Sequence, residues 1–300
     1  GQAAAPEFDL LIAGGRVIDP ASSHDAIADV AIRGGRIARV APGIAASSAR
    51  SVVDARGRVV TPGLVDLHVH APQWPQLGTG LDLPLEEWLF AHTFPLEARY
   101  TDPVFAARVW DDLVHTLVRH GTTTAVYFGT NDVDATTALA AAARRVGQRA
   151  YVGRVAMDHP DGTPEWYRDT SAEAGVAASA RSIDEIVRVD GGRGLVQPII
   201  TPRFTPACTD ALLTGLGELA AATGVLVQTH CSESDWAHGY AWERFGVSDA
   251  AKEKFRAFMR DSREQFMALS PDERREFTQQ AMDRIAAEDR QATAASPARK

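Results

Sequence analysis

PGLVDLHVHAPQWPQ, residues 62–76, is the stretch that decides the fold of this 300-residue chain. An apolar run leads into His68 and His70 and then directly into Ala-Pro-Gln. Side chains at positions i and i+2 of a strand point to the same face, so both imidazoles face the same way. One metal ion can take two ligands from such a pair, but a hydrogen-bonded pair at a strand end has the same spacing. The pair therefore needs further ligands elsewhere before it indicates a metal site.

The composition limits the classes of fold and partner. Hydrophobic residues make up 45% of the chain, which is enough to bury a large core, and the net charge of -8 argues against nucleic acid as a partner. No apolar run approaches the ~20 residues of a membrane span. Cys208 and Cys231 are too few for a disulfide framework, so a reducing, cytoplasmic compartment is expected. The Ala-rich residues 1–6 leave two alternatives, an exported protein with a trimmed precursor or an artificial extension.

Residues 1–61 are predicted to form a small β-rich unit. Gly-Gly pairs at 14–15 and 34–35 separate alternating apolar residues and indicate hairpins. The predicted strands cover residues 8–13, 17–18, 28–32, 36–40 and 59–60.

Residues 62–250 alternate strand, loop and helix, which predicts βαβ units with a parallel sheet. The first strand ends at the histidine pair, and later strands are expected at 122–128, 150–157, 195–200 and 225–230. The expected helices cover residues 103–120, 133–146, 171–188 and 209–222. Five strands in series with polar residues at their carboxyl ends favour an α/β fold of the (β/α)8 barrel type, apparently incomplete. A doubly wound open sheet is the alternative.

Residues 251–300 are charged and helical in pattern and do not resemble barrel strands. A helical hairpin is expected, with Ser270 as the cap of its second helix and a loose tail from about Gln291.

The chemically informative side chains fall at predicted strand ends. Three histidines on one face match the three-ligand shell of a zinc site that keeps a position open for water. The residues concerned are His68 and His70 after the first strand, Arg203 and Phe204 after the fourth, and His230 and Glu233 after the fifth.

The motifs around these residues resemble the guanine deaminases of the amidohydrolase superfamily over about residues 62–250. They occur in order along the chain as HVHAPQWPQ, GLDLPLEEWLFAHTFPLEARY, GTTTAVYF, VQPIITPRF and QTHCSES. The resemblance implies zinc-dependent hydrolysis of guanine to xanthine and ammonia, with a small-molecule purine as substrate and a homodimer as the candidate assembly. It further implies one zinc per site, held by His68, His70 and His230. Gln73 and Arg203 would hydrogen-bond the purine, Phe204 would stack on it, and Glu233 would transfer the proton.

Residues 8–70 resemble dihydroorotase-like hydrolases of cyclic amides in the same superfamily, which gives an alternative function. The resemblance implies that many of those enzymes bridge two metals with a carboxylated lysine. Lysine occurs here only at 252, 254 and 300, so the mononuclear deaminase interpretation is preferred.

Other histidines are weaker candidates for the site. His238 lies only eight residues past His230, too close to end another barrel strand. His115 and His120 lie on a predicted helix and are expected to be structural. His92 is expected in a loop that could cover the pocket.

The resemblance also implies ligands that this chain does not supply in the expected places. The family pattern continues with a histidine after the sixth strand and an aspartate after the eighth, whereas no histidine follows His238. A non-catalytic truncated or mosaic amidohydrolase therefore remains a second alternative.

Overall fold

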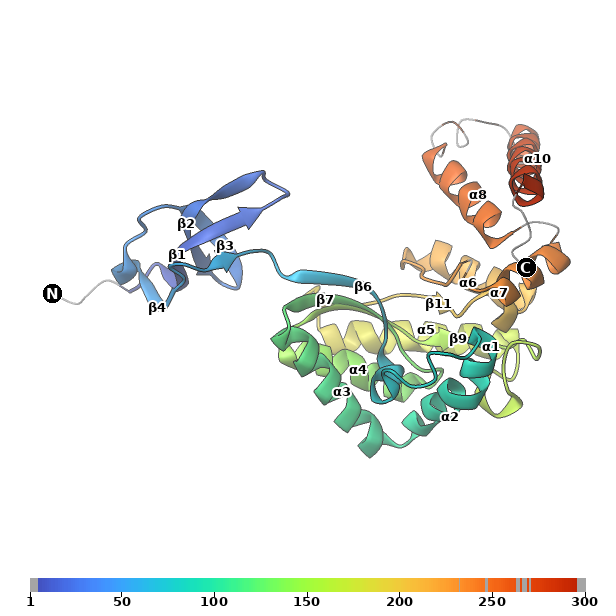
Figure 1. Cartoon of the computed structure of the whole chain (residues 1–300), viewed down its shortest axis with the longest axis horizontal. Coiled ribbons are helices and arrows are strands. Elements are labelled where there is room, and N and C mark those ends of the chain that lie inside the picture. Colours follow the sequence, from blue (N-terminus) through green and yellow to red (C-terminus); the bar gives the residue numbers. More distant parts are fainter. Residues whose placement is uncertain are drawn as a thin grey trace. The chain divides into compact units, whose positions relative to one another are not determined.

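The computed structural model describes residues 5–231, 233–245, 248–262, 265, 269 and 271–295 (Figure 1). The chain divides into two compact units, one ending at Leu64 and one beginning at Val65. The predicted boundary after residue 61 is close to this division, whereas the boundary at residue 250 stays a prediction.

The first unit is a five-stranded sheet with strand order β3-β2-β1-β4, in which β5 also pairs with β1. β1 and β2 are antiparallel, as are β2 and β3, while β4 and β5 run parallel to β1. Small apolar clusters around Leu11 and Val30 form its core. The strands are β1 (Phe8–Asp19), β2 (His24–Arg33), β3 (Arg36–Ala41), β4 (Ala49–Asp54) and β5 (Val59–Val60).

The two Gly-Gly pairs of this unit behave differently. Gly34 and Gly35 both have positive φ and form the predicted turn between β2 and β3. The hairpin predicted at Gly14 is wrong, because β1 continues through it and its pairing with β2 shifts register between Ile12 and Gly15. Gly14 has φ 73°, and its N–H donates to Asp29 Oδ1 at 2.7 Å. A bulge therefore takes up the left-handed residue without turning the chain.

The second unit contains the predicted parallel sheet, with strand order β10-β8-β7-β6. β8 runs parallel to both β7 and β10, and the first strand in sequence stands at the edge. Sequential order from an edge strand fits part of a (β/α) barrel and excludes the doubly wound alternative, in which the order reverses within the sheet. The strands are β6 (Leu64–His70), β7 (Thr122–Phe128), β8 (Arg149–Gly153) and β10 (Val196–Pro198), with a second parallel pair formed by β9 (Val155–Ala156) and β11 (Thr201–Pro202).

The predicted fifth strand, residues 225–230, forms only an isolated parallel bridge between Ile200 and Val227. The Ile200 N–H donates to the Leu226 carbonyl, and the Gln228 N–H donates to the Ile200 carbonyl, both at 2.9 Å. Leu226 and Val227 remain 59% and 50% exposed. The segment lies beside the end of the fourth strand, but these few hydrogen bonds do not form a regular β-ladder.

Four helices alternate with the strands, close to the positions predicted from the sequence. Figure 1 shows α3, α4 and α5 beside the sheet. The first begins at Pro103, where the Asp102 side chain accepts hydrogen bonds from the backbone N–H groups of Val104 and Phe105. The helices are α3 (Pro103–Arg119), α4 (Val133–Val146), α5 (Ala172–Asp190) and α6 (Asp210–Thr223).

Among the described residues, the α-helices α1 (Leu85–Trp88), α2 (Phe94–Glu97) and α7 (Asp235–Phe245) were not predicted. The expected helical hairpin corresponds to α8 (Asp249–Asp261) and α10 (Pro271–Ala295), where the rings of Phe258 and Phe277 stack at 5.5 Å. The loose tail predicted from Gln291 is wrong at its start, because α10 continues to Ala295. Ser270, the predicted cap, lies outside the described residues. Among the described helices, none combines the length and apolar composition that crossing a membrane requires.

Candidate metal centre

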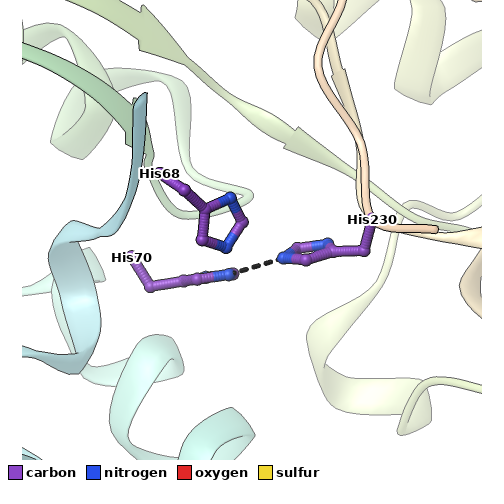
Figure 2. Close-up of side chains that lie close together, drawn as sticks. All are labelled: His68, His70 and His230. Carbon is purple, nitrogen blue, oxygen red and sulfur yellow. Dashed lines mark hydrogen bonds between the residues drawn. The ribbon is translucent and has the colours of Figure 1, made fainter. Parts of the chain in front are cut away.

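His68 and His70 lie on β6, and His230 faces them from the segment that follows the fourth strand (Figure 2). One ring nitrogen from each residue lies within 4.8 Å of the others. The strand geometry predicted that the pair would share a face, and the third histidine reaches that face as expected. Among the described residues, this is the only group of three or more His, Cys, Asp or Glu side chains placed closely enough to hold one metal ion.

The hydrogen bonds of His230 fix its tautomer. Its Nδ1 atom lies 2.7 Å from the carbonyl oxygen of Arg203. A carbonyl oxygen can only accept, so Nδ1 carries the proton and the Nε2 lone pair faces the cluster. The Nε2 atom of His70 lies 2.8 Å from it, while His70 Nδ1 is buried without a hydrogen-bond partner among the described residues. The facing Nε2 atoms of His70 and His230 fit a site that holds a cation through imidazole nitrogens.

Desolvation favours the neutral, metal-ligating form of the three imidazoles by lowering their pKa values. The pKa of His70 is well below its ordinary value because of desolvation, with the nearby His230 and Arg203 charges adding to the effect. Desolvation also lowers the pKa of His230 to about 4 and lowers the pKa of His68. Because metal ions compete with protons for these nitrogens, the lowered pKa values favour metal binding at neutral pH.

Phe128, at the end of β7, holds the imidazoles in place. Its ring stacks on His70 at 4.6 Å between centroids and lies 4.5 Å from His230 and 5.0 Å from His68. The Phe128 side chain is itself fully buried. Phe128 therefore packs against all three imidazoles.

A cavity of about 170 Å³ opens beside the histidines. This volume is below the ~300 to 1,000 Å³ usual for drug-sized ligands, so it suits a small heterocycle. Its walls combine apolar side chains with one guanidinium, one amide and one carboxylate. Besides the histidines, the lining residues are Gln73, Leu85, Trp88, Leu89, Arg203, Phe204 and Glu233.

All four remaining predicted site residues line this cavity. Phe204 is buried, and its ring lies 6.4 Å from that of His230. Gln73 belongs to the short turn of helix that follows β6. Burial raises the pKa of Glu233, and the Arg203 charge partly opposes this shift. Arg203 follows β11 and is only 2% exposed.

Glu97, the acidic partner of Arg203, was not predicted as a site residue. Arg203 Nη1 donates to Glu97 Oε2 at 2.7 Å, and Nη2 donates to Oε1 at 3.1 Å. Gln73 Nε2 donates to the same Oε1 atom at 3.2 Å. The available signal was an acidic residue at the end of WLFAHTFPLE, residues 88–97, a largely apolar stretch that begins with the tryptophan that lines the cavity.

The other histidines lie elsewhere. His92 belongs to a helical turn, Leu89–Thr93, rather than the predicted loop, and does not line the described cavity. His115 is exposed on α3, and His120 Nδ1 bonds to the Thr116 carbonyl at the end of that helix at 2.8 Å. The His238 side chain lies outside the described part of the chain.

The chain is similar to known deaminases in sequence and in structure. Guanine deaminase from Dictyostelium discoideum is 42% identical over 184 residues, which are 61% of this chain and 40% of that protein. A crystal structure of guanine deaminase from C. acetobutylicum with bound guanine has a TM-score of 0.66 at 28% identity, covering 79% of this chain and 59% of that one. A zinc-bound adenosine deaminase from Xanthomonas campestris has a TM-score of 0.69 at 27% identity, covering 82% of this chain and 55% of that one.

The chain thus spans less than two thirds of the length of these proteins. The family model described as "Amidohydrolase family" matches residues 59–253, more than half of the chain and all of the site described above. The chain therefore belongs to the amidohydrolase family.

Proposed function

We propose that this chain carries the binding site and part of the catalytic site for the zinc-dependent hydrolysis of guanine to xanthine and ammonia. The observation that carries the proposal is that one small cavity joins three convergent histidines to a buried arginine, an amide and a carboxylate. Similarity to guanine deaminases, including one with guanine bound, supports the choice of substrate.

The metal in this proposal is a single zinc ion held by His68, His70 and His230. The fit rests on neutral imidazoles, the His230 tautomer set by the Arg203 carbonyl, and the 2.8 Å approach of the His70 and His230 Nε2 atoms. When bound, zinc supplies Lewis-acid activation of water. A bridging lysine is absent from residues 1–251, which disfavours the alternative of a two-metal cyclic-amide hydrolase.

Arg203, Gln73 and Phe204 bind and orient the purine in this proposal. Arg203 keeps N–H donors beyond the two that Glu97 accepts, and these suit the C6 carbonyl oxygen of guanine. Because Gln73 uses its Nε2 on Glu97, its Oε1 acceptor is available to a ring N–H. Phe204 offers an aromatic wall for stacking.

Glu233 moves the proton. Its carboxylate lines the cavity, and burial raises its pKa toward the range that suits a group that both accepts and donates a proton near neutral pH. It accepts a proton from the attacking water while the new C2–O bond forms. It then delivers that proton so that the C2–N bond breaks and ammonia leaves, which balances guanine and water against xanthine and ammonia.

Full activity needs a group that the described cavity lining does not provide. The family pattern implies an additional aspartate that orients the water, and the cavity lining contains no aspartate among the described residues. General acid-base assistance is typically worth ~10²- to 10⁴-fold, so the 300-residue chain alone is expected to turn over guanine weakly. The second candidate, a non-catalytic amidohydrolase, shares the fold and differs in having no turnover.

The test is a guanine-to-xanthine assay on the zinc-loaded chain, together with equilibrium dialysis of labelled guanine. We expect guanine binding and turnover well below the ~10 s⁻¹ of a typical enzyme. Binding without turnover supports the non-catalytic candidate. A zinc-loaded chain that neither binds nor converts guanine overturns the proposal. Cytoplasmic location and a homodimer stay predictions, and sedimentation of the purified chain tests the second.

A further inference from the structure

Glu97 is a buried acid that none of the chemistry above requires. It is the last residue of α2, only 1% exposed, and lies 106 positions before its partner Arg203. A buried carboxylate needs a partner because taking its charge out of water is costly. The partners of Glu97 include two polar residues of the cavity wall, Arg203 and Gln73.

The carboxylate of Glu97 holds both residues at the same time. Oε2 accepts from Arg203 Nη1 at 2.7 Å, while Oε1 accepts from Arg203 Nη2 at 3.1 Å and from Gln73 Nε2 at 3.2 Å. The two Arg203 bonds form a bidentate pair, which fixes the plane of the guanidinium as well as its position. The third bond fixes which end of the Gln73 amide faces the cavity.

The surroundings of Glu97 keep this arrangement rigid. The Arg203 guanidinium lies 4.9 Å from the centre of the Phe94 ring, in the same helix as Glu97. Tyr167 is buried nearby, and burial together with the Glu97 charge raises its pKa well above the ordinary value. Its hydroxyl therefore stays protonated and adds no second negative charge to the cluster.

We infer that Glu97 is a positioning residue that determines purine specificity, by aiming Arg203 as a donor and Gln73 Oε1 as an acceptor into the cavity. The inference rests on the proposed function. A fixed donor opposite the purine C6 position favours a carbonyl oxygen and leaves an amino group there facing another donor. Glu97 thus selects 6-oxopurines over 6-aminopurines without touching the substrate.

Glu97→Gln tests this inference because it keeps the side-chain shape and removes the charge. Guanine and 2,6-diaminopurine, which differ at C6 and in the proton at N1, are the two probes in equilibrium dialysis against the zinc-loaded chain. Hydrogen bonds to charged groups are strong enough that we expect guanine binding to weaken about 10- to 100-fold. The preference for guanine over 2,6-diaminopurine is expected to fall, while zinc content stays that of the unaltered chain. Where turnover is measurable, KM should rise more than kcat falls.

Two matched variants separate positioning from a general loss of structure. Glu87→Gln removes the same charge from an exposed position on α1 and should leave both affinities unchanged. Glu97→Asp keeps the charge on a shorter side chain and should restore part of the preference for guanine.

Crystal structures of the ligand-free wild type and Glu97→Gln chains give a readout that does not depend on the proposed function. The inference predicts that the Arg203 guanidinium and the Gln73 amide reorient in the variant. Unchanged positions of both groups, or an unchanged guanine to 2,6-diaminopurine ratio in a chain that binds guanine, overturn it. A wild-type chain that binds neither purine counts against the proposed function, and the crystal structures then decide the positioning role alone.

Discussion

The Nε2 atoms of His70 and His230 lie 2.8 Å apart, although 160 positions separate the two residues in the chain. His230 offers a bare Nε2 because its Nδ1–H bonds to the Arg203 carbonyl, so the proton between the two rings belongs to His70. A cation ligated by both nitrogens takes the place of this proton. The contact therefore joins the end of β6 to the segment after the fourth strand through a single proton, which a metal ion can replace.

His230→Ala is expected to abolish zinc binding, because it removes one of three ligands and the only one from outside β6. Metal analysis after dialysis should give close to one zinc per wild-type chain and almost none for the variant. His115→Ala, at an exposed histidine on α3, is the control and should keep its zinc. Equal zinc content in all three proteins contradicts the assignment of the site.

Arg203→Ala should destabilise the fold as well as weaken purine binding. The pair with Glu97 is almost fully buried, with side-chain exposures of 2% and 0%. Removing one partner of a buried ion pair typically costs ~3 to 5 kcal/mol, because the other charge is left unpaired. Urea unfolding measures the loss, and Arg203→Met combined with Glu97→Leu should recover most of it.

The control for this measurement is an exposed ion pair. Arg188 and Glu185 pair on α5 with side-chain exposures of 67% and 34%, so Arg188→Ala should cost less than ~1 kcal/mol. If Arg203→Ala is no more destabilising than Arg188→Ala, the buried pair does not stabilise the fold.

Glu233→Gln should abolish the guanine turnover that the chain supports, because an amide cannot accept the proton. Burial raises the pKa of Glu233, so its carboxylate becomes protonated at a higher pH than an ordinary glutamate does. Activity that needs the carboxylate is therefore lost as pH falls through this raised pKa. The acidic limb of kcat/KM should lie above the ordinary glutamate range, and a limb at the ordinary position would argue against Glu233 as the base.

Gly153→Ala should destabilise the second unit, because β8 and the fourth strand approach closely at this residue. An added Cβ would lie 1.9 Å from Thr201 Oγ1 and 2.6 Å from the Ile199 carbonyl oxygen. Overpacking of this kind typically costs ~1 to 3 kcal/mol. In Gly217→Ala, on α6, the new methyl meets no heavy atom within 4 Å, and the change should stabilise the helix by up to ~1 kcal/mol. Equal stability of the two variants contradicts the close approach.

The sequence by itself determined the elements whose signals are local. The helix predicted from residue 103 begins at Pro103, and the strand predicted at 122–128 matches β7 residue for residue. Alternation of such elements was enough to predict a parallel α/β sheet with its polar side chains at one edge. The motifs around His68 and His230 predicted a metal site because ligand type and strand-end position are both readable in the chain, and the structure brings these histidines together.

Only the tertiary structure determined the features that depend on residues far away in the sequence. Gly14 carries the same local signal as Gly34, but β2 continues opposite it, so the chain makes a bulge where a hairpin was expected. Residues 225–230 have a strand-like sequence but form only an isolated bridge, because the described chain supplies few partners for their backbone hydrogen bonds. Glu97 escaped the sequence argument for the same reason. Its role comes from Arg203 and Gln73, which contact it from other segments of the chain. A charged residue in an apolar stretch does not by itself indicate which residue pairs with it.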